Sequence, residues 1–394
     1  MHFPRPAFFR AAALAVAAHC LCAVPADAGA PMTPPTIFET PKPAASTAAP
    51  KTPPQTSAKK TDAKPAVAAP AAKPATSAPV NLDTTLKSWG FTRVASAKKD
   101  TASWRNRSAV FEAVRDKSYL NIVGVRISLS APVSERNGVW TIPRSDYDAS
   151  LLPILSPTAS TSTLPRRVRH VLLDPGHGGK EPGTQNDTLK LVEKNLTLDV
   201  AKRVKAILEK QYGIRVTLTR TNDTGLALAD RSALTKKWNT DVFVSIHFNA
   251  LQSAPTAAGI ETYILTPRGQ TSTNNSGTRV AKTSELTARE LGHSSNTWNV
   301  LLGYHLQNSL VQKLKANDRG LRRARFGVLK GTTCPSVLVE CGYLSNANEA
   351  QKISSPAHRQ KIAEAITEGI VAYNTVMEKL SAASKKTTTR TAAK

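Results

Sequence analysis

The sequence predicts an α/β protein whose main domain, residues 168–380, has a largely parallel sheet flanked by helices on both faces. Short apolar runs typical of buried strands alternate there with longer segments in which apolar residues recur at helical spacing. The 26 prolines and 20 glycines exclude one long coiled coil. We expect a small α+β domain at 80–160 and a disordered linker at 29–79 to precede the main domain.

Residues 1–28 resemble a secretory signal peptide. Arg5 and Arg10 supply its positive charge, residues 11–24 form a short apolar core, and Ala26-Asp27-Ala28 is a small-x-small cleavage site. An uncleaved membrane anchor is the alternative, but the apolar run is shorter than the ~20 residues that cross a bilayer. We therefore predict an exported protein of the periplasm or cell envelope, with no transmembrane anchor after cleavage.

The four cysteines are too few for a disulfide-rich scaffold. Cys20 and Cys22 leave with the signal peptide, and Leu21 stands where a lipoprotein signal ending at Cys22 would have a small residue. The remaining two, Cys334 and Cys341, are separated by an expected strand over 336–341. An extended strand of that length places them about 20 Å apart, too far for a disulfide. We predict two free, buried thiols.

The linker at 29–79 is rich in Pro, Ala, Thr and Lys, and it lacks the apolar residues that would offset the entropy of ordering. In the α+β domain, residues 119–129 predict two strands around a turn, and residues 139–142 predict another strand. Residues 125–155 resemble the small module at the N-terminus of copper amine oxidases and of some cell-wall proteins. The module has no catalytic cluster, so we expect a binding or spacer domain.

In the main domain, the helix that starts at Glu193 is predicted from Leu196, Val200 and Val204, which share one face. The tail at 381–394 is basic and polar, and we expect it to be flexible. The other predicted elements follow the same two patterns. They are strands over 168–173, 214–219, 241–246, 260–265 and 337–340, and helices over 193–211, 226–238, 301–314 and 356–380.

Four residues that could carry chemistry stand beside these elements: His177, Glu193, His247 and Glu340. Ligands bind at strand ends in open α/β sheets, and two His with one Glu are a common ligand set for catalytic zinc. A second Glu could then take a proton from water. Each residue alone also has a structural interpretation, such as a hydrogen-bonded His or a Glu at a helix N-terminus.

The local motifs are Leu173-Asp174-Pro175-Gly176-His177-Gly178-Gly179, Glu193-Lys194-Asn195, Val244-Ser245-Ile246-His247-Phe248-Asn249-Ala250 and Val337-Leu338-Val339-Glu340-Cys341-Gly342-Tyr343. In this order, and with Arg220, Arg231 and Arg319-Gly320, they resemble the zinc-dependent N-acetylmuramoyl-L-alanine amidases of the amidase-3 type over about 168–375.

This resemblance implies that His177, Glu193 and His247 bind Zn²⁺ and that Glu340 is the catalytic base and then the acid. Zinc-activated water would cleave the amide between N-acetylmuramic acid and the L-alanine of the stem peptide. The substrate would be peptidoglycan, and the process cell wall remodelling or cell separation. Asn249 and Arg231 would contact the substrate or support the ligands.

Related enzymes of cell division carry a helix over the zinc that a partner removes. Residues 266–299, with Glu285 and Glu290, would be such a gating loop opened by an activator protein, or an ordinary surface loop. Three departures from the family pattern leave the shape of the groove open: Lys237-Trp238, Phe248 and Cys341.

The formal net charge is +25. The chain has no nucleic-acid motif and few aromatic residues, so we predict no nucleic-acid partner. A basic surface suits an anionic envelope, although it could also be merely solvated.

Two rival functions stay open. One is a wall-binding protein without activity, which would lack a ligand or Glu340, and the other is a metal hydrolase of a different exported amide.

Overall fold

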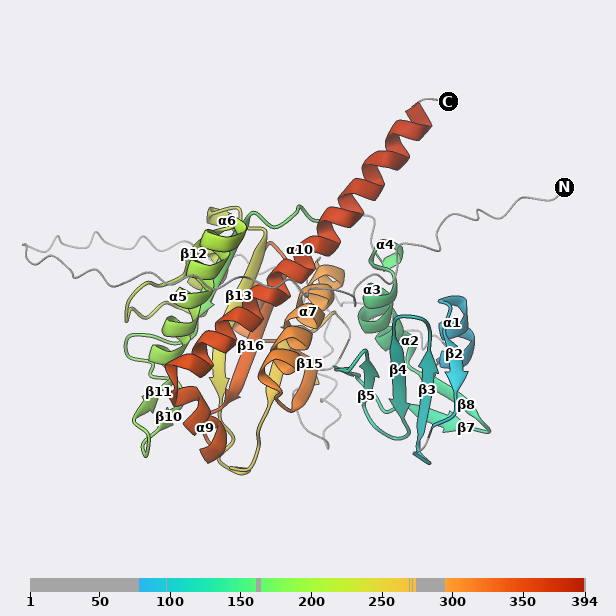
Figure 1. Ribbon diagram of the computed structural model, residues 1–394, viewed down its shortest axis with the longest axis horizontal. Helices are drawn as coiled ribbons and strands as arrows, with labels where there is room; N and C mark the ends of the chain where they lie inside the picture. The colour runs from blue at the N-terminus through green and yellow to red at the C-terminus, as the bar shows by residue number, and fades with distance from the viewer. Residues whose placement is uncertain are drawn as a thin grey trace, which may run out of the picture. The chain divides into compact units, whose positions relative to one another are not determined.

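The computed structural model describes residues 78–96, 98–160, 164–268, 270, 272–273 and 295–392. These residues form a large mixed sheet with helices packed on it (Figure 1). The predicted signal peptide and residues 29–77 of the predicted linker lie outside the described residues, so both stay predictions.

The large sheet has eleven strands among the described residues. In the part of this sheet that belongs to the main domain, neighbouring strands are parallel, except that β14 (Ile260–Leu265) runs antiparallel to β16 (Ser336–Tyr343). This arrangement confirms the largely parallel sheet. In spatial order the strands are β12 (Arg215–Leu218), β9 (His170–Pro175), β13 (Val242–Asn249), β16 (Ser336–Tyr343), β14 (Ile260–Leu265), β15 (Asp318–Ala324), β6 (Val125–Ser128), β5 (Tyr119–Ile122), β4 (Val110–Val114), β3 (Thr101–Arg105) and β2 (Thr92–Val94).

Helices cover both faces of the main sheet, as predicted. The helices α5 (Glu193–Tyr212), α7 (Asn296–Leu314) and α10 (Pro356–Ala392) lie side by side on one face, and α9 (Ala347–Ser354) packs against α10 (Figure 1). On the other face, α6 (Leu228–Lys237) packs against α8 (Gly327–Lys330).

Strand alternation divides the core between these two faces. Val171 and Leu173 of β9 belong to the cluster under α5 and α10, whereas Leu172 belongs to a second cluster with Val328 and Leu329 of α8. Continuous apolar runs of this kind are typical of parallel strands buried on both faces.

The N-terminal part is α+β, as expected, and its strands continue the large sheet. Strand β6 pairs in parallel with β15 at Ile127 and Leu321, and the backbone N–H of Arg126 donates to Asp318 Oδ2 at 2.5 Å. The smaller elements are β1 (Val80–Asn81), α1 (Leu82–Ser88), β7 (Ser134–Arg136), β8 (Val139–Ile142), α2 (Arg144–Asp146), the π-helical turn η1 (Tyr147–Leu151), α3 (Leu152–Leu155), α4 (Pro157–Ser160), β10 (Gln185–Asn186) and β11 (Leu191–Val192).

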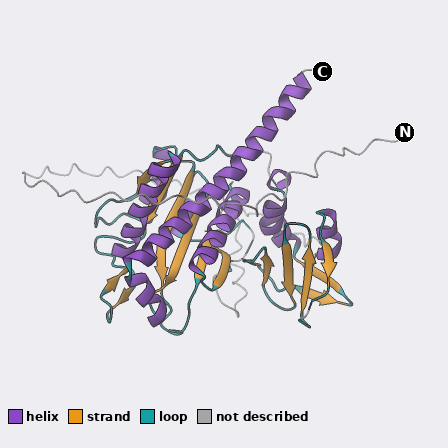
Figure 2. Cartoon of the chain, viewed as in Figure 1, coloured by secondary structure: helices purple, strands orange, loops and turns teal. Residues whose placement is uncertain are grey.

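Two helices differ from the sequence prediction. Helix α7 begins at Asn296, before the expected 301. Helix α10 continues to Ala392 (Figure 2), although we expected a flexible tail over 381–394. The reason is local, because residues 381–392 contain neither Gly nor Pro, the two residues that most oppose a helix, although Thr is the commonest residue of the segment.

Other expectations concern the thiols and the surface. Cys334 and Cys341 are free and buried, as predicted, and burial raises the pKa of the Cys334 thiol to about 12.

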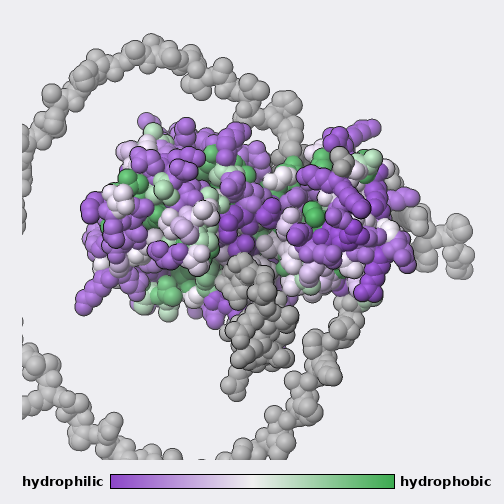
Figure 3. All heavy atoms as spheres, turned by 90° about the horizontal axis from the view of Figure 1, so that it is seen from below, coloured by the Kyte–Doolittle hydropathy of each residue, from purple (hydrophilic) through white to green (hydrophobic). Residues whose placement is uncertain are grey.

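The described surface seen in Figure 3 is mainly hydrophilic, in keeping with the high charge of the chain. Among the described helices, none has the length and apolar character that a membrane span requires.

Candidate metal centre and active site

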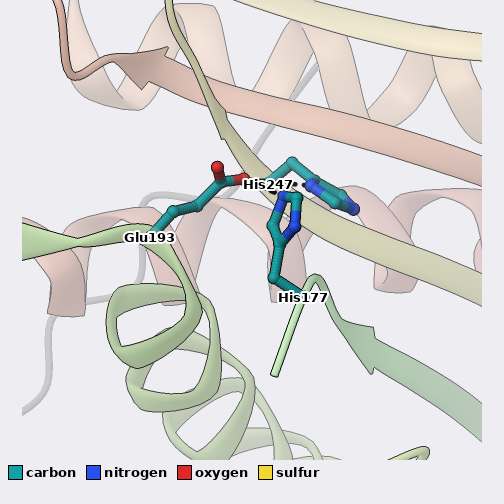
Figure 4. A group of neighbouring side chains, drawn as sticks. All are labelled: His177, Glu193 and His247. Carbon is teal, nitrogen blue, oxygen red and sulfur yellow. Dashed lines mark hydrogen bonds and ion pairs between the residues drawn. The ribbon is translucent and has the colours of Figure 1, made fainter. Parts of the chain in front are cut away.

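The structure brings His177, Glu193 and His247 together although they are far apart in the sequence (Figure 4). Glu193 Oε1 lies 3.2 Å from His177 Nε2 and 3.0 Å from His247 Nδ1. Ligand atoms around a tetrahedral zinc ion, with bonds near 2.0–2.1 Å, lie about 3.3 Å from one another. The donor types and their spacing therefore fit a zinc ion.

Three different elements supply these side chains. His177 follows β9, Glu193 is the first residue of α5, and His247 lies near the end of β13. His177 has φ +60°, a left-handed conformation that few residues other than glycine adopt. Strained backbone of this kind needs support from its surroundings.

Glu193 is fixed by its hydrogen bonds. Oε2 accepts from the backbone N–H of Thr184 at 2.7 Å, and Oε1 accepts from that of Phe248 at 3.0 Å. Burial alone would raise the pKa of Glu193, but its contacts with His177 and His247 outweigh burial and lower it. The carboxylate is thus held in its charged form, which is the form that binds a metal.

Two buried arginines hold the backbone that carries His177. Arg220 donates from Nε to the carbonyl of Pro175 at 3.0 Å and from Nη2 to that of Gly176 at 2.8 Å. Arg231 donates from Nη2 to the carbonyl of His177 at 2.7 Å. Arg231 was expected to contact substrate or support the ligands, and its side chain is only 2% exposed. Its contacts are therefore with the loop that carries the ligand.

Glu340 lies beside the three candidate ligands. On β16 it is the register partner of His247 on β13. Burial, followed by the nearby carboxylates of Glu193 and Glu261, raises the pKa of Glu340 well above its usual range. Its buried Oε2 has no hydrogen-bond partner among the described residues. That oxygen can accept a proton without breaking a described hydrogen bond.

Sequence reasoning missed Glu261, a fully buried carboxylate on β14. It is the register partner of Glu340 on the other side of β16. Asn249, the other tentative site residue, donates from Nδ2 to Glu261 Oε2 at 3.1 Å. Glu261 stands in the apolar run Ile260–Leu265, so the argument from a carboxylate in a buried strand, applied to Glu340, would also have found it.

The predicted gating residues Glu285 and Glu290 lie outside the described residues. The described flanks of that segment can be placed. Strand β14 ends at Leu265, and α7 begins at Asn296. The segment therefore starts at the end of β14 that is remote from Glu261, the residue that pairs with Glu340. The gate stays a prediction.

Gly176 leaves room for the imidazole of His247. A Cβ atom on Gly176 would lie 2.5 Å from His247 Nε2 and 2.6 Å from its Nδ1, which no packing tolerates. We expect Gly176→Ala to displace His247 and to weaken zinc binding by about 10–100-fold, as disruption of ligand support does elsewhere. Zinc affinity, measured by competition with a chromophoric chelator, checks this.

Gly213→Ala is the matched control for this substitution. Gly213 has φ +62° and open space where a Cβ atom would lie, so the variant adds backbone strain without a clash. Its zinc affinity should equal that of the wild type. Equal affinities in all three proteins would contradict the close fit of Gly176 against His247.

Comparison with known proteins identifies the class. The sequence profile of the amidase-3 family, described as N-acetylmuramoyl-L-alanine amidase, matches residues 171–372, just over half of the chain. The α/β sheet with this constellation at its strand ends is therefore that of an amidase. The chain belongs to the N-acetylmuramoyl-L-alanine amidase family.

Two curated relatives agree, and one solved structure is similar over the same part of the chain. The chain is 34% identical over 237 residues to the N-acetylmuramoyl-L-alanine amidase AmiA of Escherichia coli, covering 55% of this chain and 80% of AmiA. It is 32% identical over 227 residues to a probable amidase, AmiB, of Haemophilus influenzae, and the match spans about half of each chain, 52%. A solved N-acetylmuramoyl-L-alanine amidase from Clostridium difficile has 34% identity, covers 52% of this chain and 97% of its own, and gives a TM-score of 0.43.

Proposed function

We propose that this protein is an exported, zinc-dependent amidase that cleaves the bond between N-acetylmuramic acid and the L-alanine of peptidoglycan. Family membership supports the reaction. The single observation that carries the zinc dependence is the convergence of His177, Glu193 and His247, with Glu340 in register beside His247. The biological process would be cell wall remodelling or cell separation.

In this proposal His177 Nε2, Glu193 Oε1 and His247 Nδ1 hold the zinc ion. A zinc ion bound there supplies Lewis acidity, which polarises the scissile carbonyl and makes water more acidic. The hydrogen bonds to Glu193 from Thr184 and Phe248 keep its carboxylate oriented toward the histidines. The chain thereby fixes the ligand set before any substrate arrives.

Glu340 moves the proton. Its Oε2, unpartnered among the described residues, takes a proton from the attacking water and then gives it to the nitrogen of the leaving L-alanine. The raised pKa of Glu340 suits the second step, because a carboxyl group that holds a proton can act as the acid.

The test is peptide release from purified sacculi by the protein without residues 1–28. We expect peptides with a free L-alanine amino end, release abolished by a chelator, and release restored by added zinc. Release that a chelator does not change would contradict zinc dependence. If the protein cleaves synthetic amides but releases no peptides from sacculi, the result favours a hydrolase of another exported amide. If it binds zinc but hydrolyses neither substrate, the result favours a wall-binding protein without activity.

Location and partners complete the proposal. The predicted signal peptide supports export to the periplasm or cell envelope, and the substrate is the partner that the family supports. An activator acting on residues 266–299 stays a prediction. Residues 80–160 stay a predicted binding or spacer module.

A further inference from the structure

A β-bulge in β15 lies two strands from Glu340. Ile260 pairs with Asp318 and Glu261 pairs with Gly320, so Arg319 is the extra residue of β15. Gly320, the residue after the bulge in β15, has φ +100°, and Gly259, the residue before the partner strand β14, has φ +120°. Both values lie in the region that favours glycine. Bulges next to active sites commonly direct one side chain out of the regular pattern of the strand.

Glu261 holds Arg319 by one nitrogen only. Arg319 Nε donates to Glu261 Oε1 at 2.7 Å. The same carboxylate accepts from Tyr343 Oη at 3.0 Å and from Tyr263 Oη at 2.8 Å, and Arg322 Nη1 lies 3.3 Å away. One carboxylate therefore faces two guanidinium groups and cannot occupy all of their donors.

The outer end of Arg319 is available for a further contact. Its Nη1 and Nη2 donate no hydrogen bond to the part of the chain that the structure describes, and 28% of the side chain is exposed. The guanidinium lies 5.0 Å from the centre of the Tyr343 ring, which restricts its orientation. A planar guanidinium with two free nitrogens matches a carboxylate, which it can bind by two parallel hydrogen bonds.

The position of Arg319 suits a substrate group close to the reacting bond. Glu340 is on β16, and Arg319 is on β15, two strands away with β14 between them. Two strand spacings amount to about 10 Å, which an extended peptide covers in about three residues. Stem peptides carry free carboxylates within that reach.

We propose that Arg319 is a specificity-determining residue that binds a free carboxylate of the stem peptide within three residues of the scissile amide. This inference rests on the proposed amidase function. Arg322 is the natural comparison, because it contacts the same Glu261 but donates its Nε to the carbonyl of Arg319 and is only 16% exposed. Arg322 would support Arg319 without touching the substrate.

The experiment compares two soluble substrates, an N-acetylmuramoyl tripeptide with free carboxylates and the same compound with its carboxylates amidated. We expect wild-type kcat/KM to be about tenfold or more higher for the free carboxylates, in line with the strength of a charge-assisted hydrogen-bond pair. Arg319→Gln should lower this ratio to about one, mainly through KM. Arg322→Gln should lower kcat/KM for both substrates by the same factor and keep the ratio.

A loss in Arg319→Gln that is equal for both substrates would overturn the proposal, since Arg319 would then act only through Glu261. Binding of the two peptides to Glu340→Gln, measured by calorimetry, needs no turnover. Tighter binding of the free carboxylates that Arg319→Gln abolishes supports the proposal, and equal binding overturns it. Hydrolysis of neither substrate by the wild type would count against the amidase function, while the binding result would still decide the role of Arg319.

Discussion

Glu340→Gln should reduce peptide release from sacculi by about 10²–10⁴-fold, the range that a positioned proton-transfer group contributes. The glutamine has nearly the same shape, so the packing of β16 should not change. It cannot take a proton from water, and this is the step that the proposal assigns to Oε2. Since Glu340 is not among the three candidate ligands, zinc content should stay at the wild-type value.

Glu349→Gln is the matched control for Glu340→Gln. Its half-buried carboxylate accepts from the backbone N–H groups of Tyr343 and Gly259, at 2.7 and 2.9 Å, and is outside the candidate ligand set. We expect Glu349→Gln to lower the melting temperature but to retain most of the release activity of the folded protein. Zinc-loaded, folded Glu340→Gln that still released peptides at the wild-type rate would remove Glu340 from the mechanism.

Local sequence patterns predicted much of the fold, because most of its determinants are local. The strand Ile260–Leu265 has the predicted bounds, and the helix from Glu193 ends within one residue of its prediction. The antiparallel direction of β14 and the pairing of β6 with β15 depend on tertiary contacts, which no local pattern contains. Helix α10 differs for a local reason, because neither Gly nor Pro ends it before Ala392, whereas the polar composition of 381–394 suggested a flexible tail.

The candidate site shows a similar division. His177, Glu193, His247 and Glu340 stand in motifs that a sequence can display, and their convergence is visible only in the structure. The sequence cannot decide whether Arg231 contacts the substrate or supports the ligands, because its position in the chain does not reveal its burial. Glu261 stands in a strand that the sequence displays, and only its register with Glu340 is a property of the sheet.

Arg231→Met should lower the free energy of unfolding by about 3–5 kcal/mol, the cost of removing one partner of a buried ion pair. Arg231 and Asp174 are 2% and 1% exposed, and Nη1 donates to Asp174 Oδ1 at 2.8 Å. The carbonyls of Pro175 and His177 would also lose donors. Urea unfolding measures this free energy. The control is the partly exposed pair of Arg203 and Asp199. There, Arg203→Met should lower the free energy of unfolding by about 1 kcal/mol or less.

A second substitution separates the charge of Arg231 from its positioning role. Arg231→Met with Asp174→Asn leaves no unpaired charge, and the new asparagine can still bond the hydroxyls of Thr219 and Ser245. Stability should therefore recover in part. Zinc affinity and peptide release should not recover, because the carbonyl of His177, at φ +60°, still lacks its donor. Recovery of both stability and activity would mean that Arg231 only neutralises Asp174 and that His177 keeps its conformation without it.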